Sequence, residues 1–231
     1  MALAPFVLVP GNWLGGWAWD RVVPALRTAG HPVTAVTLPG LEPHAAERGR
    51  LRLVDHVDAL ADVVASSGPG TVLVAHSGAG KIVTGVLDRH PQAVARVVYV
   101  DSGPAGEGWA DDLPAELDEL ALPPFDALEA SLEGLDEDDL AQFRRRAVPH
   151  PAAVLREPLH LTDPRRREVP TTMIACSFPA ATILELAVSG HPMFAEVGRL
   201  GALSCVDLPT GHWPMWSRPD DLAAALLAAA G

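Results

Sequence analysis

Cysteines are scarce in this chain and long apolar runs are absent, and each of these features excludes a class of protein. Cys176 and Cys205 are too few for a disulfide framework or a thiolate metal site, so we expect two buried thiols. No apolar run approaches the roughly 18 residues of a membrane-spanning helix. The apolar run at residues 6–9 is also too short for a secretory signal, and no basic residue precedes it. A cytoplasmic protein fits these features best.

Basic residues are scarce as well, because 17 Lys and Arg stand against 29 Asp and Glu, a net charge of −12. Nucleic acids and anionic membranes would repel such a chain, so neither is an expected partner. The expected partner is a small-molecule substrate, and the oligomeric state stays open, a homodimer included. With 231 residues, of which 48% are hydrophobic, the chain can build one domain over 1–231 with a sizeable core.

Apolar runs rich in β-branched residues alternate with helical patterns along the chain. We expect strands at residues 6–9, 32–38, 71–75, 96–100, 171–176 and 203–208, with helices near 20–29, 53–64, 78–90 and from 217 onward. Continuous apolar strands that alternate with helices indicate a mostly parallel sheet covered on both faces. The sequence therefore predicts an α/β fold with about six strands and a functional site at their carboxyl ends.

One segment interrupts this alternation. Residues 103–168 contain no convincing strand, and residues 107–139 carry thirteen carboxylates and no Lys or Arg. We interpret 103–168 as a helical insertion that lies over the strand ends as a cap. Its charge run is interpreted as a solvated face rather than a binding surface.

Ser77 stands where the third expected strand turns into a helix, in the stretch A75-H76-S77-G78-A79-G80. This context is that of a nucleophile elbow, whose sharp turn exposes the serine and crowds the neighbours two positions away. Small residues are therefore needed at positions 75 and 79, and alanine meets this requirement. The turn also places the backbone N–H of Gly78 at a helix N-terminus, where it can donate to an oxyanion. A plain helix cap is the alternative role for Ser77.

A loop rich in glycine and tryptophan follows the first expected strand, with the sequence P10-G11-N12-W13-L14-G15-G16-W17-A18-W19. Enzymes with a nucleophile elbow take a second oxyanion donor from this loop, and here the backbone N–H of Asn12 would supply it. Trp13, Trp17 and the distant Trp213 are candidates for the wall of a substrate pocket. Packing in the core is the alternative for these tryptophans.

His212 is the best candidate for a general base among the nine histidines. It follows the last expected strand, in T210-G211-H212-W213, and the preceding glycine lets the loop bend. A serine followed by a distant C-terminal histidine matches the chain order of a Ser–acid–His triad. His76, next to the serine, points the other way along the strand and is interpreted as structural.

These stretches resemble the α/β-hydrolase superfamily, and most closely its small hydroxynitrile-lyase and plant methyl-esterase-like branch. The resemblance is carried by residues 6–19 and 31–40, by A75-H76-S77-G78-A79-G80 and by G211-H212, which keep the order and spacing of that branch. It implies the α/β-hydrolase fold and Ser–His–acid chemistry on small esters, thioesters or related carbonyl compounds. It also implies cofactor-free chemistry, and no metal site is predicted.

The acid of the triad departs from the family pattern. The resemblance places an Asp in the loop after the penultimate strand, here C176-S177-F178-P179-A180-A181-T182, which has no carboxylate before Glu185. Asp101 ends the strand that follows the nucleophile helix, where some members of the superfamily carry the acid, so Asp101 is the predicted acid. Its alternative role is to cap the following loop. Two other carboxylates are weaker candidates. Asp207 is too near His212 on the same strand, and Glu185 falls in an expected helix.

Lys81, the only lysine of the chain, follows Ser77 by four residues. The helix dipole opposes a cation at a helix start. Pairing with a carboxylate of the cap is the interpretation we favour for it over a catalytic role.

The sequence thus predicts a serine hydrolase that cleaves a small or medium apolar carboxylic ester or thioester through an acyl-enzyme. Ser77 would attack the acyl carbonyl, His212 would carry the proton and Asp101 would orient His212. The backbone N–H groups of Gly78 and Asn12 would hold the oxyanion. One alternative is a lyase or cyclase that uses the same Ser/His site without an acyl-enzyme. The other is a non-catalytic hydrolase-like binding protein.

Overall fold

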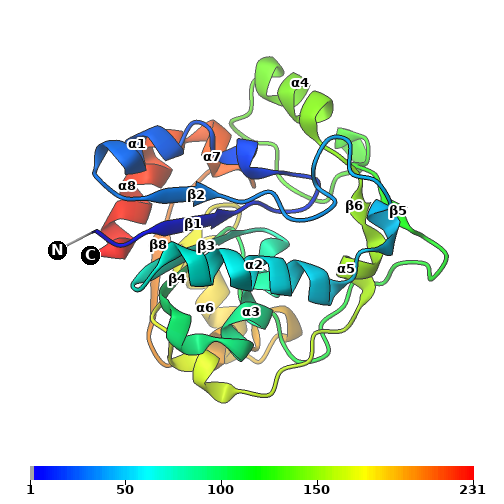
Figure 1. The fold of residues 1–231 in the computed structure, drawn as a ribbon. Coiled ribbons are helices and arrows are strands. Elements are labelled where there is room, and N and C mark those ends of the chain that lie inside the picture. Colours follow the sequence, from blue (N-terminus) through cyan, green and yellow to red (C-terminus); the bar gives the residue numbers. More distant parts are fainter. Residues whose placement is uncertain (1–2) are drawn as a thin grey trace.

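The structure, a computed structural model, describes residues 3–231 and is built around one six-stranded sheet (Figure 1). The strands are β1 (Phe6–Val9), β2 (Val33–Ala35), β3 (Thr71–His76), β4 (Val94–Val100), β7 (Thr171–Ala175) and β8 (Leu203–Asp207). Their order is β2-β1-β3-β4-β7-β8, and every neighbouring pair is parallel. The predicted α/β fold with a parallel sheet is confirmed.

Helices cover both faces of this sheet (Figure 1). The first face carries α2 (Leu53–Ser67), α3 (Ala79–Arg89) and α6 (Ala180–Val188), and the second carries α1 (Val23–Thr28), α7 (Pro214–Ser217) and α8 (Pro219–Ala230). Successive strand residues point to opposite faces, so Leu73 joins the first core and Val72 and Val74 join the second. Burial on both faces explains why the strands are continuous apolar runs.

Some element bounds differ from the predicted ones. β2 ends at Ala35 rather than residue 38, because its partner β1 is short and ends at Val9. The last helical segment consists of two helices that meet at Arg218. Pro219 lacks the N–H that would continue α7, so the chain starts a new helix there.

Residues 103–168 lie between β4 and β7, but less of this insertion is helical than predicted. It contains α4 (Glu137–Arg146), α5 (Ala152–Arg156), the 3₁₀ helices η4 (Phe125–Ala127) and η5 (Pro164–Glu168), and the short strands β5 (Glu119–Leu120) and β6 (His150–Pro151). The expectation of no strand here is wrong, since β5 and β6 pair antiparallel. Repeated Pro and Gly keep much of the remainder irregular.

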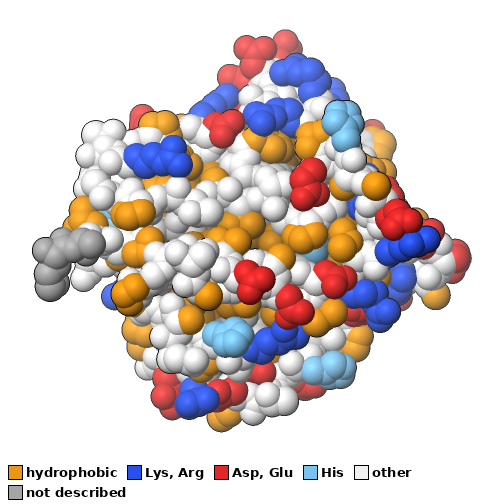
Figure 2. Space-filling model, in the orientation of Figure 1, with side chains coloured by type: hydrophobic (Ala, Val, Ile, Leu, Met, Phe, Trp, Pro, Cys, Tyr) orange, Lys and Arg blue, Asp and Glu red, His pale blue; other side chains and the backbone are white. Residues whose placement is uncertain are grey.

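Within the insertion, α4 has a charge distribution that suits a helix. Its first turn is acidic, and three arginines occupy its last turn, so both ends complement the helix dipole. Figure 2 shows these acidic and basic side chains together at the top of the molecule, over α4. The last part of the acidic run therefore lies in a helix whose final turn carries the opposite charge.

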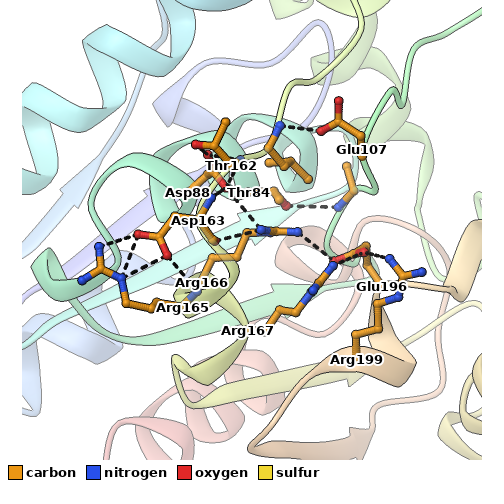
Figure 3. Close-up of polar contacts among 12 residues, drawn as sticks. Thr84, Asp88, Glu107, Thr162, Asp163, Arg165, Arg166, Arg167, Glu196 and Arg199 are labelled. Carbon is orange, nitrogen blue, oxygen red and sulfur yellow. Dashed lines mark hydrogen bonds and ion pairs between the residues drawn. The ribbon is translucent and has the colours of Figure 1, made fainter.

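A largely buried ion cluster fastens the end of the insertion to α3 (Figure 3). Arg166 lies 3.2 Å from Asp88 and 3.4 Å from Glu196, and all three side chains are less than one-tenth exposed. Asp88 also accepts the backbone N–H groups of Thr162 and Asp163, each at 2.9 Å. Removing one member would leave buried charge without a partner, which is strongly destabilising. The cluster therefore holds the insertion against the helix that follows β3.

Both cysteines are free thiols, but only Cys176 is buried as expected. Cys205 is half-buried because β8 is an edge strand of the sheet. Among residues 3–231, no helix combines the length and apolarity that crossing a membrane requires.

Candidate active site

Ser77 occupies the sharp turn between β3 and α3. Its backbone φ is +53°, in the left-handed region that non-glycine residues rarely adopt. Two hydrogen bonds support this conformation. The Ser102 hydroxyl donates to the Ser77 carbonyl at 2.6 Å, and the Ser77 N–H donates to the Val100 carbonyl at 3.3 Å. The surrounding strands therefore hold the serine in the strained geometry of an elbow.

The glycine that this turn requires is Gly80, not a residue at position 75 or 79. Ala75 and Ala79 are both buried, so their methyl groups fit in the turn. A Cβ at position 80, by contrast, would lie 2.3 Å from the Gly103 carbonyl oxygen and 2.6 Å from the Ser102 hydroxyl. The close approach in this elbow thus falls one residue later than the usual motif places it.

His212 lies in the loop between β8 and α7, with Nε2 2.7 Å from the Ser77 hydroxyl oxygen. The insertion holds this loop: the His212 N–H donates to the Ser131 carbonyl at 2.8 Å, and the Gly211 N–H donates to the Glu133 carbonyl at 3.1 Å. A Cβ at position 211 would lie 2.6 Å from the Ser131 carbonyl oxygen and 2.5 Å from that of Glu133. Glycine is thus needed here because the insertion passes so close to the histidine loop.

Asp101 directly follows β4, and its carboxylate contacts the other nitrogen of the His212 ring. The Nδ1–H of His212 donates to Oδ2 of Asp101 at 2.5 Å. Burial alone would raise the pKa of the Asp101 carboxyl. The hydrogen bonds from His212 and Ser177 and the charge of His212 outweigh that effect, and they lower this pKa to about 2. Asp101 is therefore a carboxylate across the physiological pH range.

Ser177, which the sequence analysis did not single out, holds the Asp101 carboxylate in place. Its hydroxyl donates to Oδ2 at 2.6 Å, and its N–H donates to Oδ1 at 2.9 Å. The N–H of Cys176 adds a third contact to Oδ1 at 3.2 Å. Ser177 lies in the loop after β7, which lacks the aspartate of the family pattern. That missing aspartate was the sequence feature that could have drawn attention to this loop.

The weaker candidates for the acid are engaged elsewhere. The carboxylate of Asp207 accepts the Ala180 N–H at 2.7 Å and so caps the start of α6. Glu185 lies within α6. Asp101 is thus the only carboxylate among the described residues that bonds to the His212 ring.

Asn12 and Gly78, the two predicted oxyanion donors, lie next to each other beside Ser77. A Cβ on Gly78 would come within 2.4 Å of the Asn12 side-chain oxygen, which shows how closely the two residues approach. Both residues line the cavity described below. Neither backbone N–H donates to another group of residues 3–231. Both N–H groups are therefore free to bind an oxyanion.

His76 links the segments that carry these residues. Its Nδ1 accepts the Gly11 N–H at 3.3 Å, so its Nε2–H donates to the His212 carbonyl, at 2.7 Å. Burial and then the nearby charge of His212 lower the pKa of His76 to about 3, which keeps the ring neutral. One buried imidazole thus ties the loop after β1 to the histidine loop.

A cavity of about 660 Å³ opens beside Ser77 and His212. Trp13 and Trp213 line it, together with mostly apolar side chains such as Trp109, Leu128, Leu155, Met173, Ile183 and Phe194. A cavity of this size and lining suits a small organic molecule. Among the described residues, no group of His, Cys, Asp and Glu is arranged to hold a metal ion.

Trp17 does not line this cavity, so its assignment to the pocket wall was wrong. Its ring stacks on Trp216 with 5.6 Å between the ring centroids, and the Arg146 guanidinium lies over the ring, 4.5 Å from its centre. The short 3₁₀ helix η1 (Gly16–Trp19) turns the ring toward the core shared with α7 and α8. Core packing is therefore the role of Trp17.

Comparison with known proteins gives a family match and several relatives. The sequence model of the alpha/beta hydrolase family matches residues 6–225. A carbendazim hydrolyzing esterase from a Nocardioides species is 39% identical over 124 residues, which cover 53% of this chain and 50% of that enzyme. The alignment thus spans about half the length of this relative. Methylesterase 7 from Arabidopsis thaliana is 28% identical over 96% of this chain and 94% of its own length.

Solved structures agree on the fold. A methylesterase from Arabidopsis superimposes with a TM-score of 0.75 at 20% sequence identity, over 98% of both chains. At this level of identity, the likeness establishes a shared fold only.

Proposed function

Because the chain belongs to the alpha/beta hydrolase family, we propose that it is a serine hydrolase that cleaves carboxylic esters or thioesters through an acyl-enzyme. The observation that carries the proposal is an unbroken hydrogen-bonded path from Asp101 through His212 to the Ser77 hydroxyl at the wall of a cavity. Relatives named as esterases, among them the Nocardioides enzyme and methylesterase 7, support the choice of an ester bond.

In the first half of the reaction, Ser77 Oγ forms a bond to the acyl carbon while its proton passes to Nε2 of His212. The carbonyl oxygen becomes an oxyanion beside the N–H groups of Gly78 and Asn12. The tetrahedral intermediate then collapses, the bond to the leaving oxygen or sulfur breaks, and the leaving group takes the proton from His212. The product is an ester of Ser77 and a free alcohol or thiol.

In the second half, water attacks the acyl-enzyme with His212 as the general base, and the carboxylic acid leaves as Ser77 recovers its proton. Asp101 stabilises the imidazolium at both stages and keeps the proton of neutral His212 on Nδ1. No cofactor takes part in any of these steps.

The cavity favours a small or medium apolar substrate. Its wall is mainly aromatic and aliphatic, so burial of an apolar acyl or aryl group would supply the binding energy. The chemistry requires no macromolecular partner, and we propose that the protein acts in the cytoplasm on a small molecule. Size-exclusion chromatography with light scattering would establish whether it does so as a monomer or a homodimer.

A fluorophosphonate probe tests the proposal directly. We expect wild-type protein to be labelled at Ser77 and to hydrolyse para-nitrophenyl esters, and Ser77→Ala to lose both properties. Ser204→Ala, which removes the hydroxyl of an exposed residue on the edge strand β8, is the matched control and should keep both. Absence of labelling and of ester turnover in the wild type would overturn the proposal and favour a binding protein. Labelling without hydrolysis of any ester would favour the lyase or cyclase alternative.

A further inference from the structure

Lys81 is a buried cation in an unfavourable position. It lies in the first turn of α3, where the helix dipole opposes positive charge, and its side chain is only 6% exposed. Burial lowers the pKa of its amine to about 8, although the charge of Asp111 acts in the opposite direction. A buried ammonium group at a helix N-terminus is unfavourable unless specific hydrogen bonds compensate for its lost hydration.

The contact is with the main chain of the insertion, not with a carboxylate as the sequence suggested. The Lys81 ammonium donates to the carbonyl oxygens of Val154 at 3.1 Å, Leu155 at 2.6 Å and Glu157 at 2.7 Å. These carbonyls end α5, and a cation at a helix C-terminus is favourable. Lys81 is therefore a cap for α5 supplied by the helix that follows Ser77.

The segment that Lys81 grips forms part of the cavity wall. Lys81, Leu155 and Asp111 all line the cavity, and the Asp111 N–H donates to the same Leu155 carbonyl at 3.0 Å. The Glu157 carboxylate accepts the Leu53 N–H at the start of α2 at 3.0 Å. The wall is thus tied to α3 through Lys81 and to α2 through Glu157.

We propose that Lys81 is a positioning residue that fixes the Val154–Glu157 segment, and with it Leu155 of the cavity wall, at a set distance from Ser77 and thereby determines which acyl groups are accepted. The selectivity part of this inference rests on the proposed ester hydrolysis. An ammonium has three N–H donors, and all three are engaged by carbonyls. Lys81 therefore acts on the substrate through the wall and not as a direct ligand.

Selectivity between a short and a bulky ester provides the first test. In Lys81→Met, we expect the ratio of acetate to octanoate kcat/KM for the para-nitrophenyl esters to change by about tenfold or more. Lys81→Arg, which keeps the charge and the donors, should restore most of the wild-type ratio. Loss of the same factor on both esters, or no change on either, would overturn the selectivity role.

Arg156→Met is the matched control. Arg156 also clamps backbone carbonyls with a cation, at Pro114 and Leu117, but it does so within the insertion and does not line the cavity. We expect its removal to leave the acetate-to-octanoate ratio unchanged. An equal change in this variant would mean that any loosening of the insertion alters selectivity, and would overturn the assignment to Lys81.

Hydrogen exchange tests, independently of activity, the tie between Lys81 and the Val154–Glu157 segment. Amide exchange at residues 152–159 should be faster in Lys81→Met than in wild type at the same pH, while residues 71–77 keep their protection. Should the Met variant fail to fold, Lys81→Gln, which keeps two donors, serves in both experiments. Unchanged exchange would overturn the tie. Faster exchange in a protein without ester turnover would support the tie while refuting the proposed function.

Discussion

Asp101 accepts the Nδ1–H of His212 at 2.5 Å, although 111 residues separate the two along the chain. The contact arises because β4 and β7 pair in parallel with Val100 opposite Ile174, so Asp101 emerges beside the loop that follows β7. Ser177 in that loop donates to the same carboxylate. The carboxylate that contacts His212 thus follows β4, and the loop after the neighbouring β7 supplies hydrogen bonds to it.

Asp101→Asn should lower kcat by about 10³–10⁴-fold, because an amide at this position favours the wrong tautomer of His212 and cannot stabilise its imidazolium. Steady-state kinetics on para-nitrophenyl acetate measures the effect. Asp207→Asn is the control, since Asp207 caps α6, and it should retain activity within about threefold. An Asp101→Asn variant with near-normal kcat would remove Asp101 from the mechanism.

Ser177→Ala should lower kcat by about tenfold, which corresponds to about 1.5 kcal/mol, the lower end of what one hydrogen bond to a charged acceptor contributes. The carboxylate keeps two backbone N–H donors, so the defect should be far smaller than that of Asp101→Asn. Ser177→Thr keeps the hydroxyl and should recover part of the loss. Equal kinetics for Ala, Thr and wild type would show that the hydroxyl contributes nothing to orienting the acid.

Ala79→Gly and Gly80→Ala together test which position of the elbow requires glycine. Ala79→Gly restores the usual motif but should only lower the free energy of unfolding by about 1 kcal/mol, since glycine is the poorer helix former. Gly80→Ala should cost more, and should also reduce fluorophosphonate labelling of Ser77, because the new methyl group meets the Gly103 carbonyl. Thermal unfolding and labelling of both variants check this ordering, and the reverse ordering would contradict it.

Acid should destabilise the protein from about pH 6.5 downward, before the carboxylates titrate. Burial is the main cause that lowers the pKa values of His76 and His150, each to about 3. The unfolded chain therefore binds more protons than the folded one between about pH 6.5 and 3, and the stability present above this window is lost as the pH falls through it. Each histidine should contribute a slope of about 1.4 kcal/mol per pH unit.

Denaturant unfolding between pH 7.5 and 4.5 measures this slope. His150→Phe should reduce it by the share of one histidine, whereas the control His160→Gln, at a side chain 77% exposed, should leave it unchanged. The same slope in His150→Phe as in wild type would refute the contribution of His150.

Local sequence was enough to predict the six strands of the main sheet, their parallel arrangement, and both Ser77 and His212. Strands buried on both faces are apolar along nearly their whole length, and such runs can be recognised in the sequence. The elbow and the histidine loop were recognisable for a related reason, since each is a short stretch next to a strand end. The small residues around Ser77 follow from crowding within a single turn.

The partners of these segments depended on tertiary structure. Strand order and register bring Asp101 to His212, and the packing of α7 turns Trp17 from the cavity into the core. The ties of Lys81 and Gly211 to the insertion are contacts with backbone carbonyls, which every residue carries and no sequence pattern marks. Sequence thus determined the fold and the reacting pair through local patterns of size and polarity. Only the folded chain decided which distant groups support that pair, because long-range contacts depend on how the elements pack.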